Sequence, residues 1–184
     1  MTSANLASLI DLLNEKGGAA YFGEPVSQLE HSLQAAHCAH LANAGPAQIS
    51  AALLHDIGHM LHGLDETVAG RGHDTRHEEL AATYLSQWFG EEVTMPIRLH
   101  VPAKRFLCWR DPHYLEQLSP ASVESLALQG GPMNQQHAAE FLLKPFARQA
   151  VALRQWDDQA KIPGLRVPDA ASYLPVLQAA SRPI

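Results

Sequence analysis

Apolar residues recur at helical spacing along almost the whole chain, and no stretch of useful length alternates between apolar and polar residues as a half-buried strand would. The first helical segment, residues 5–16, ends at Gly17 and Gly18. With 184 residues, 46% of them hydrophobic, the chain is long enough to bury one sizeable core. The pattern therefore predicts a single all-α domain over residues 1–184, a bundle of helices around a central site.

Capping and breaking residues predict where these helices begin and end. Ser27 and Glu30 form a capping-box pattern that opens a helix extending to about Asn43. Pro46 opens the next helix, which we expect to continue through residues 51–63. The remaining expectations are helices at 74–89, 91–110 with interruptions at Pro96 and Pro102, from Pro120 with Ser119 as N-cap, 134–143, 145–158 and 169–180, and a loop at 63–73.

The stretch AALLHDIGHMLHG, residues 51–63, places His55 and Asp56 at the end of an apolar run. Two polar groups there cost free energy unless a partner satisfies them. Four other apolar-periodic helices each carry a residue of the same kind, and a helical bundle can direct such side chains toward one interior point. The candidate metal site consists of His31, His55, Asp56, His77, His100 and Asp157.

Imidazole and carboxylate donors without a thiolate suit iron, manganese or zinc. Cys38 and Cys108 each stand alone, so we expect neither a disulfide framework nor a thiolate zinc site. Because neighbours on a helix lie about 100° apart, Asp56 is placed to bridge two metals while His55 binds one of them. The residues alone leave separately satisfied histidines as the alternative. The histidines assigned to the surface or to loops are His37, His40, His62, His73, His113 and His137.

Three of the candidate ligands have a cationic or hydrogen-donating neighbour one helical turn away. The pairs are His55 with His59, His100 with Lys104, and Asp157 with Arg154. Since each pair shares one helix face, convergent ligands would bring the three donors together as an anion pocket. Ser122 and Ser125 would add hydroxyl groups, and such a pocket suits a phosphate or phosphonate group. The alternative for each basic residue is a solvated surface charge.

The net charge of −6 disfavours a nucleic-acid partner. The N-terminal segment carries Asp11 and Glu15 and lacks a basic region, so we expect a helix there and not a signal peptide. No apolar run approaches the length of a membrane span. We therefore expect a cytoplasmic protein without a membrane partner, either a monomer or a small homo-oligomer.

The order H…HD…H…H…D resembles the HD-domain superfamily, most members of which are metal-dependent phosphohydrolases. The surrounding sequence is similar to one branch, the mixed-valent di-iron oxygenases that cleave carbon–phosphorus bonds. The resemblance implies an HD-type helical bundle around a dinuclear metal site, and it extends from about Asn5 to Pro168. The segments that carry it are YFGEPVSQLEHSLQAA, AALLHDIGH, HVPAKRFL, YLEQLSPAS, LQGGPM and RQWDDQAK.

This resemblance implies an Fe(II)/Fe(III) pair held by the six candidate ligands, with Asp56 as the bridge and O2 as co-substrate. Tyr21 and Glu24 match a Y-x-G-E loop, in which the tyrosine occupies an iron coordination position until substrate arrives and the glutamate faces the substrate nitrogen. The implied catalytic residues are Tyr21, His59 and Lys104, and the implied substrate-binding residues are Glu24, His59, Lys104, Ser122, Ser125 and Arg154.

The implied substrate is a small organophosphonate of the 1-hydroxy-2-aminoethylphosphonate type. A quaternary ammonium prefers aromatic faces and diffuse negative charge, which favours the N-trimethylated form, cleaved to glycine betaine and phosphate. The residues that suggest this are Tyr21, Phe22, Glu24, Asp65, Glu66, Phe106 and Trp109. The alternatives are the same reaction on the primary amine, giving glycine and phosphate, a metal-dependent phosphohydrolase, and a non-catalytic metal- or ligand-binding helical module.

Overall fold

The computed structural model describes residues 2–21, 23–61 and 76–183, and in these ranges helices are the only regular elements apart from two isolated β-bridges. The predicted all-α fold is confirmed. The helices are α1 (Thr2–Lys16), α2 (Gln28–Leu41), α3 (Pro46–Leu54), α4 (Ile57–Leu61), α5 (His77–Leu85), α6 (Glu91–Arg110), α7 (Pro112–Gln117), α8 (Pro120–Leu128), α9 (Gln135–Leu142), α10 (Ala147–Gln159), the 3-10 helix η2 (Ala170–Tyr173) and α11 (Leu174–Ala180).

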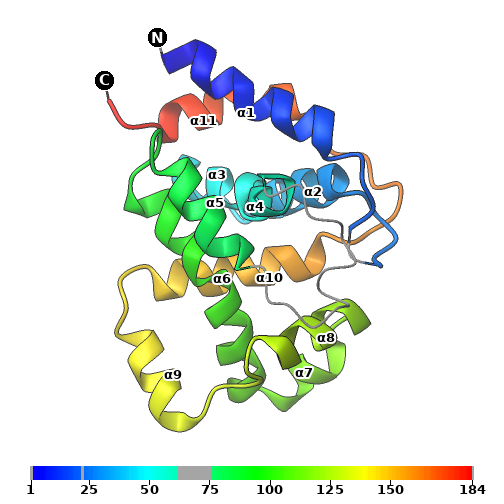
Figure 1. Ribbon diagram of the computed structural model, residues 1–184, viewed down its shortest axis with the longest axis vertical. Coiled ribbons are helices and arrows are strands. Elements are labelled where there is room, and N and C mark those ends of the chain that lie inside the picture. The colour runs from blue at the N-terminus through cyan, green and yellow to red at the C-terminus, as the bar shows by residue number, and fades with distance from the viewer. Residues whose placement is uncertain (1, 22, 62–75, 184) are drawn as a thin grey trace.

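The long helix α6 connects the two ends of the molecule (Figure 1). At one end α1 and α11 lie together near both termini, and at the other end lie α7, α8 and α9. Helices α2, α3, α4 and α5 fill the middle. There α6 packs against α3, α5 and α10, and α10 also packs against α2 and α3. The crossing of α6 and α10 therefore brings side chains from most of the central helices to one place.

Two of the predicted helix starts are confirmed by their caps. Ser27 Oγ accepts a hydrogen bond from the Glu30 backbone N–H at 3.1 Å, and the Glu30 carboxylate accepts one from the Ser27 N–H at 2.7 Å. Ser119 Oγ accepts from the backbone N–H of Ser122 at 3.2 Å and begins α8, with Pro120 in its first turn. Each cap satisfies backbone donors that a helix start otherwise leaves without partners.

The prediction of one continuous helix through residues 51–63 is wrong, because α3 ends at Leu54 and α4 begins at Ile57. The two residues between them, His55 and Asp56, form a turn. Neighbouring side chains on an unbroken helix point about 100° apart, whereas both of these side chains are buried in the interior. Both side chains therefore lie in the interior at the junction between α3 and α4.

The predicted interruptions of the segment 91–110 are also wrong. Helix α6 contains both Pro96 and Pro102 in its interior. A proline removes one backbone hydrogen bond, but the packing of α6 against α3, α5 and α10 supports the helix on several sides. Helix α7, which Asp111 caps, was not predicted. Helices α5 and α10 begin at His77 and Ala147, slightly later than the predicted starts at 74 and 145. The loop predicted at 63–73 lies outside the described residues.

Two hydrophobic clusters meet along α6 and α10. The larger cluster contains Ile97 of α6 and Leu153 of α10, whereas the smaller one contains Leu99 and Ala150 of the same helices. His100 therefore lies on α6 next to the change from one cluster to the other. The candidate site occupies this junction, where polar side chains are surrounded by apolar packing.

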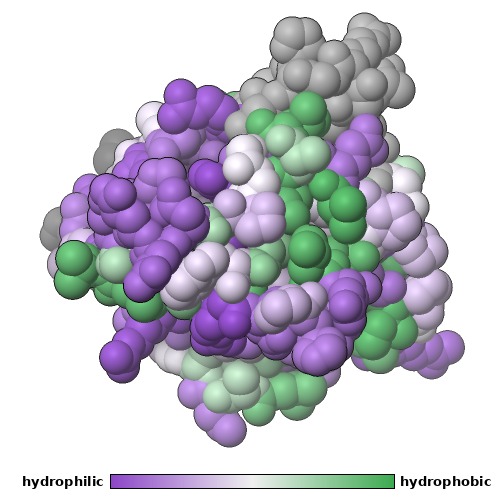
Figure 2. Space-filling view, turned by 90° about the horizontal axis from the view of Figure 1, so that it is seen from below, coloured by the Kyte–Doolittle hydropathy of each residue, from purple (hydrophilic) through white to green (hydrophobic). Residues whose placement is uncertain are grey.

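The surface of the molecule is mixed in character. Seen from below, it combines hydrophilic residues with a band of hydrophobic residues near the centre of the face (Figure 2). Among the described residues, no helix is long and apolar enough to cross a membrane. Both described cysteines, Cys38 and Cys108, are free thiols, as the sequence predicts.

Candidate metal centre

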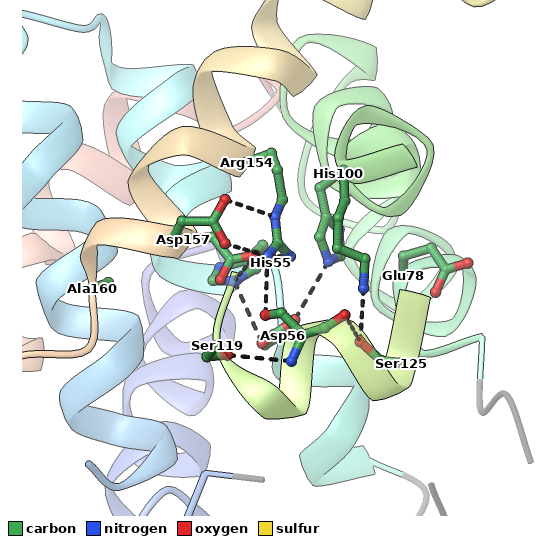
Figure 3. Close-up of polar contacts among 12 residues, drawn as sticks. His55, Asp56, Glu78, His100, Ser119, Ser125, Arg154, Asp157 and Ala160 are labelled. Carbon is green, nitrogen blue, oxygen red and sulfur yellow. Dashed lines mark hydrogen bonds and ion pairs between the residues drawn. The ribbon is translucent and has the colours of Figure 1, made fainter. Parts of the chain in front are cut away.

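The six residues predicted as metal ligands converge at the centre of the bundle, and each is at least 92% buried. They come from five places in the chain. Helix α2 carries His31, the α3–α4 turn carries His55 and Asp56, α5 begins with His77, α6 carries His100 and α10 carries Asp157. In Figure 3 Asp157 extends from α10 toward His55, and His100 faces the same space from α6. Whether they bind metal stays a prediction.

Asp56 lies between two pairs of histidines. Its Oδ2 atom is 3.4 Å from His55 Nε2 and 3.7 Å from His31 Nε2. Its Oδ1 atom is 3.2 Å from His77 Nε2 and 3.6 Å from His100 Nε2. One carboxylate therefore offers one oxygen to each pair, which is the arrangement expected of a bridging ligand.

Asp157 completes the first of these two groups. Its Oδ1 atom lies 3.5 Å from His31 Nε2, and its Oδ2 atom lies 3.9 Å from His55 Nε2. Asp157 Oδ1 is buried and accepts no hydrogen bond from the part of the chain that is described. A buried carboxylate oxygen without a donor is costly, and a cation beside it would remove that cost.

Backbone carbonyls fix the tautomers of three of the histidines. The bonds are His31 Nδ1 to Ala160 O at 2.9 Å, His55 Nδ1 to Ala52 O at 2.9 Å and His100 Nδ1 to Ile97 O at 2.6 Å. A ring nitrogen that donates to a carbonyl carries the hydrogen, so Nε2 presents a lone pair. The Nε2 atoms within each pair are only 3.2 Å apart. In the pair His31 and His55 both atoms are acceptors, which suits a shared cation and not a hydrogen bond.

Burial keeps two of the candidate histidine ligands in the protonation state that metal binding requires. It lowers the pKa of His31 to about 4 and that of His100 to about 3, so both imidazoles are neutral near pH 7. Burial alone would raise the pKa of Asp157, but the Arg154 guanidinium outweighs it and holds this pKa well below its usual range. For His77, burial alone would lower the pKa, but the hydrogen bond and charge of Asp56 outweigh it and raise this pKa above its usual value. The neutral imidazoles of His31 and His100 and the ionised carboxylate of Asp157 are donors that suit first-row metal ions.

Tyr21 and His59 lie beside different members of the candidate ligand set. The Tyr21 hydroxyl donates to Asp56 Oδ2 at 2.8 Å, and its ring stacks on His31 with centroids 3.9 Å apart. The His59 ring stacks on His77, also at 3.9 Å, and ligand atoms of His59, His77 and Asp56 lie within 4.8 Å of one another. The structure thus brings two of the three predicted catalytic residues, Tyr21 and His59, next to the candidate ligands.

Two of the three donors predicted for an anion pocket, Lys104 and Arg154, contact serines of α8 beside the candidate ligands. Lys104 is buried and its Nζ donates to Ser125 Oγ at 2.7 Å. Burial, together with the nearby charge of Arg154, lowers the pKa of Lys104 to about 7. Arg154 Nη2 donates to Ser122 Oγ at 3.3 Å. The cations predicted from one-turn spacing therefore meet the two predicted serines.

The charge of Arg154 is already balanced by neighbouring carboxylates. Its Nη1 donates to Asp157 Oδ2 at 2.7 Å, and its Nε and Nη2 pair with Asp158 (Figure 3 shows Arg154 beside Asp157). Tyr114 also donates to Asp158. These contacts hold the guanidinium in place. It links Asp157 to Ser122 of α8 by hydrogen bonds to both residues.

Sequence reasoning missed Lys161, Asp158 and Tyr114. Lys161 Nζ lies 3.1 Å from Glu24 Oε1 and donates to Ser122 Oγ at 3.2 Å. It follows Asp157 by four residues, the same spacing that pointed to His59 and Lys104. The signal was therefore present, although Lys161 lies just beyond the end of α10.

The aromatic residues predicted to favour a substrate with a quaternary ammonium do not form one cluster among the described residues. Phe106 belongs to the smaller hydrophobic cluster, with its ring centroid 5.2 Å from that of Phe141, so its position is that of a core residue. Trp109 is 39% exposed. Phe22 and the acidic pair at 65–66 lie outside the described residues, as do His62 and His73.

Known proteins are similar to this chain over most of its length. The HD domain family model matches residues 29–119. A hydroxymethylphosphonate dioxygenase of Gimesia maris is 48% identical over 169 residues, which cover 91% of this chain and 84% of that protein. A [1-hydroxy-2-(trimethylamino)ethyl]phosphonate dioxygenase (glycine-betaine-forming) of Leisingera caerulea is 39% identical over 172 residues, 91% of this chain and 85% of that protein.

Proposed function

The chain belongs to the HD-domain family, in the branch of the phosphonate dioxygenases, and from this premise we propose that it uses O2 to cleave the carbon–phosphorus bond of a 1-hydroxyalkylphosphonate and releases phosphate. The observation that carries the proposal is the position of Asp56 between two histidine pairs, near the hydrogen-bonded Lys104 and Ser125. A metal pair and an anion pocket in contact are what a phosphonate oxygenase needs.

Two iron ions, mixed-valent in the active state, are the proposed cofactor. His31, His55 and Asp157 would hold one ion, His77 and His100 the other, and Asp56 would bind both. When bound, the ions supply the one-electron chemistry with O2 that amino-acid side chains cannot supply. Two observations support this assignment. The imidazoles of His31 and His100 are neutral, and the buried Asp157 Oδ1 atom accepts no hydrogen bond from the described residues.

The protein groups around the ions have separate tasks. The ammonium of Lys104 and the hydroxyls of Ser122 and Ser125 would hold the phosphonate oxygens by charge-assisted hydrogen bonds. His59 would donate to the same group or to the oxygen on C1. Tyr21 keeps its proton at Oη, directed at Asp56, because burial raises its pKa well above the ordinary value. Its buried ring, which stacks on His31, would limit the access of water from that side of the site.

Hydroxymethylphosphonate is the substrate that the structure favours. The carboxylate of Glu24, which the resemblance assigns to a substrate nitrogen, lies 3.1 Å from the Lys161 ammonium. A substrate without a nitrogen needs no free carboxylate, and the Gimesia maris relative is named for such a substrate. One molecule of it and one of O2 contain the atoms of one formic acid and one phosphoric acid, so formate and phosphate are the expected products.

The N-trimethylated phosphonate predicted from the sequence is the second candidate. The Leisingera caerulea relative supports it, although the identity is lower. This substrate and one O2 would give glycine betaine and phosphate. The primary-amine substrate is a further alternative for the same test, and a phosphohydrolase would instead release phosphate from a phosphomonoester without O2.

The deciding experiment measures phosphate release with and without O2. The protein is loaded with Fe(II) under argon, mixed with each candidate phosphonate, and then exposed to O2. We expect phosphate only after O2 is admitted, with an equal amount of formate from hydroxymethylphosphonate. The His77→Ala variant is the matched inactive control. Phosphate released under argon would overturn the O2-dependent reaction and indicate hydrolysis of the C–P bond, and no turnover by the iron-loaded protein would favour a non-catalytic binding module.

A further inference from the structure

Lys161 and Glu24 form an ion pair at the edge of the proposed phosphonate pocket. Lys161 Nζ lies 3.1 Å from Glu24 Oε1, and the two side chains are only 13% and 9% exposed. The same ammonium donates to Ser122 Oγ at 3.2 Å and to Ser119 Oγ at 3.4 Å. Ser122 also accepts from Arg154, so a continuous series of contacts joins Glu24 to the metal positions.

The backbone on both sides of Lys161 is fixed to α2. The carbonyl of Ala160 accepts from His31 Nδ1 at 2.9 Å. The buried side chain of Gln34 makes two hydrogen bonds to Ile162, donating to its carbonyl at 2.8 Å and accepting from its N–H at 3.0 Å. Lys161 is therefore held in place by a candidate metal ligand and by a buried amide, unlike a lysine on a free surface loop.

The charges in this part of the pocket disfavour a cationic substrate. Lys104, Arg154 and Lys161 all approach the serines of α8. Arg154 is balanced by Asp157 and Asp158, and the carboxylate that a cationic nitrogen could use, Glu24, is already paired. A quaternary ammonium entering here would have to displace Lys161 or lie beside it, and like charges at such distances repel strongly in a poorly solvated site.

We propose that Lys161 determines substrate specificity: by pairing with Glu24 it excludes phosphonates that carry a cationic nitrogen and selects 1-hydroxyphosphonates with an uncharged substituent. The inference rests on the proposed function. Specificity of this kind comes from an unfavourable contact with the wrong substrate as well as from good contacts with the right one. Lys161 acts at the substrate and has no role as a metal ligand.

The test compares kcat/KM for hydroxymethylphosphonate with kcat/KM for 1-hydroxy-2-(trimethylammonio)ethylphosphonate. We expect wild type to prefer the first. Lys161→Met exposes the Glu24 carboxylate, so the preference should fall on the order of tenfold, mainly through the KM of the cationic substrate. Lys161→Arg should retain the wild-type preference, and adding Glu24→Gln to Lys161→Met should remove the gain. Lys144→Met, at an exposed lysine, is the matched control.

A binding measurement without turnover supports the kinetic one. Methylphosphonate and 2-(trimethylammonio)ethylphosphonate lack the hydroxyl on C1, so calorimetric titration reports their affinity alone. We expect Lys161→Met to strengthen binding of the cationic ligand relative to methylphosphonate. If Lys161→Met does not fold, as judged by circular dichroism, Glu24→Gln replaces it and should shift the preference further toward hydroxymethylphosphonate.

The two proposals fail in different ways. If wild type releases no O2-dependent phosphate from either substrate, the proposed function is wrong. If wild type turns over hydroxymethylphosphonate but Lys161→Met leaves both the kinetic preference and the relative affinities unchanged, the role given to Lys161 is overturned. A wild-type enzyme that prefers the cationic substrate would overturn it as well.

Discussion

The Nε2 atoms of His31 and His55 lie 3.2 Å apart, although both rings use Nδ1 to donate to backbone carbonyls. Two lone pairs are thereby directed at one point, next to the carboxylates of Asp56 and Asp157. Without a cation these groups repel one another inside the core. The free energy of metal binding should therefore appear directly as stability of the fold.

The first prediction is that metal raises the melting temperature. At a hundredfold excess of free Fe(II) over its dissociation constant, one bound ion stabilises the fold by about 2.7 kcal/mol. For a chain of this length that corresponds to about 5–10 °C. Calorimetry under argon, with and without a chelator, measures it. His113→Gln, which changes an exposed histidine, is the control and should show the same increase as wild type. If metal does not change the melting temperature of wild type, the proposed metal centre is contradicted.

The second prediction concerns how many ions each variant keeps. Because Asp56 faces both histidine pairs, Asp56→Ala should lose both ions, whereas His77→Ala or Asp157→Ala should each lose one. Lys104→Ala should keep the wild-type iron content and bind substrate more weakly, since Lys104 contacts Ser125 and not the ligands. Elemental analysis of iron per chain provides the measurement. Equal iron loss in Lys104→Ala would count against its place in the anion pocket.

Much of the fold follows from local signals in the sequence. The cap at Ser27 and the proline start at Pro46 are local, and the structure contains both. The candidate ligands could be found because a histidine or aspartate on an apolar helix has few low-energy alternatives to a buried partner. Convergence of His31 with Asp157 was predictable as a tendency of helical bundles, without any distance.

The missed features depend on tertiary packing. The break at His55 and Asp56 separates two short helices whose residues have helical periodicity throughout, so no local signal marks it. Pro102 inside α6 is tolerated because neighbouring helices support it, which the sequence does not show. The contact of Lys161 with Glu24 joins residues far apart in the chain, and only the folded structure reveals it.

The third prediction is a pH dependence of phosphonate binding. Burial, with the charge of Arg154 nearby, lowers the pKa of Lys104 to about 7. Its ammonium is therefore present below pH 7 and is lost as the pH rises through that value. KM for the phosphonate should increase above pH 7, by at most about tenfold per pH unit for a single proton. Lys104→Arg stays charged, so its KM should show only the titration of the substrate. Identical pH profiles for the two enzymes would contradict the prediction.

The fourth prediction concerns Gly58, which allows α4 to approach the start of α5. A Cβ atom at this position would lie 2.1 Å from the carbonyl oxygen of His77, and because that atom belongs to the backbone it cannot rotate away. Gly58→Ala should therefore force the two helices apart and lower stability by about 1–3 kcal/mol, the usual cost of overpacking, despite the better helix propensity of alanine.

The same shift should reach the metal centre, because it moves His77 away from Asp56 Oδ1, now 3.2 Å from its Nε2. We expect Gly58→Ala to bind about one iron fewer per chain than wild type, in addition to melting at a lower temperature. Gly18→Ala is the matched control, since a Cβ there would meet no atom within 4 Å, and it should keep wild-type stability and iron content. If Gly58→Ala behaves like Gly18→Ala in both measurements, the close contact between Gly58 and His77 does not position the second metal ligand group.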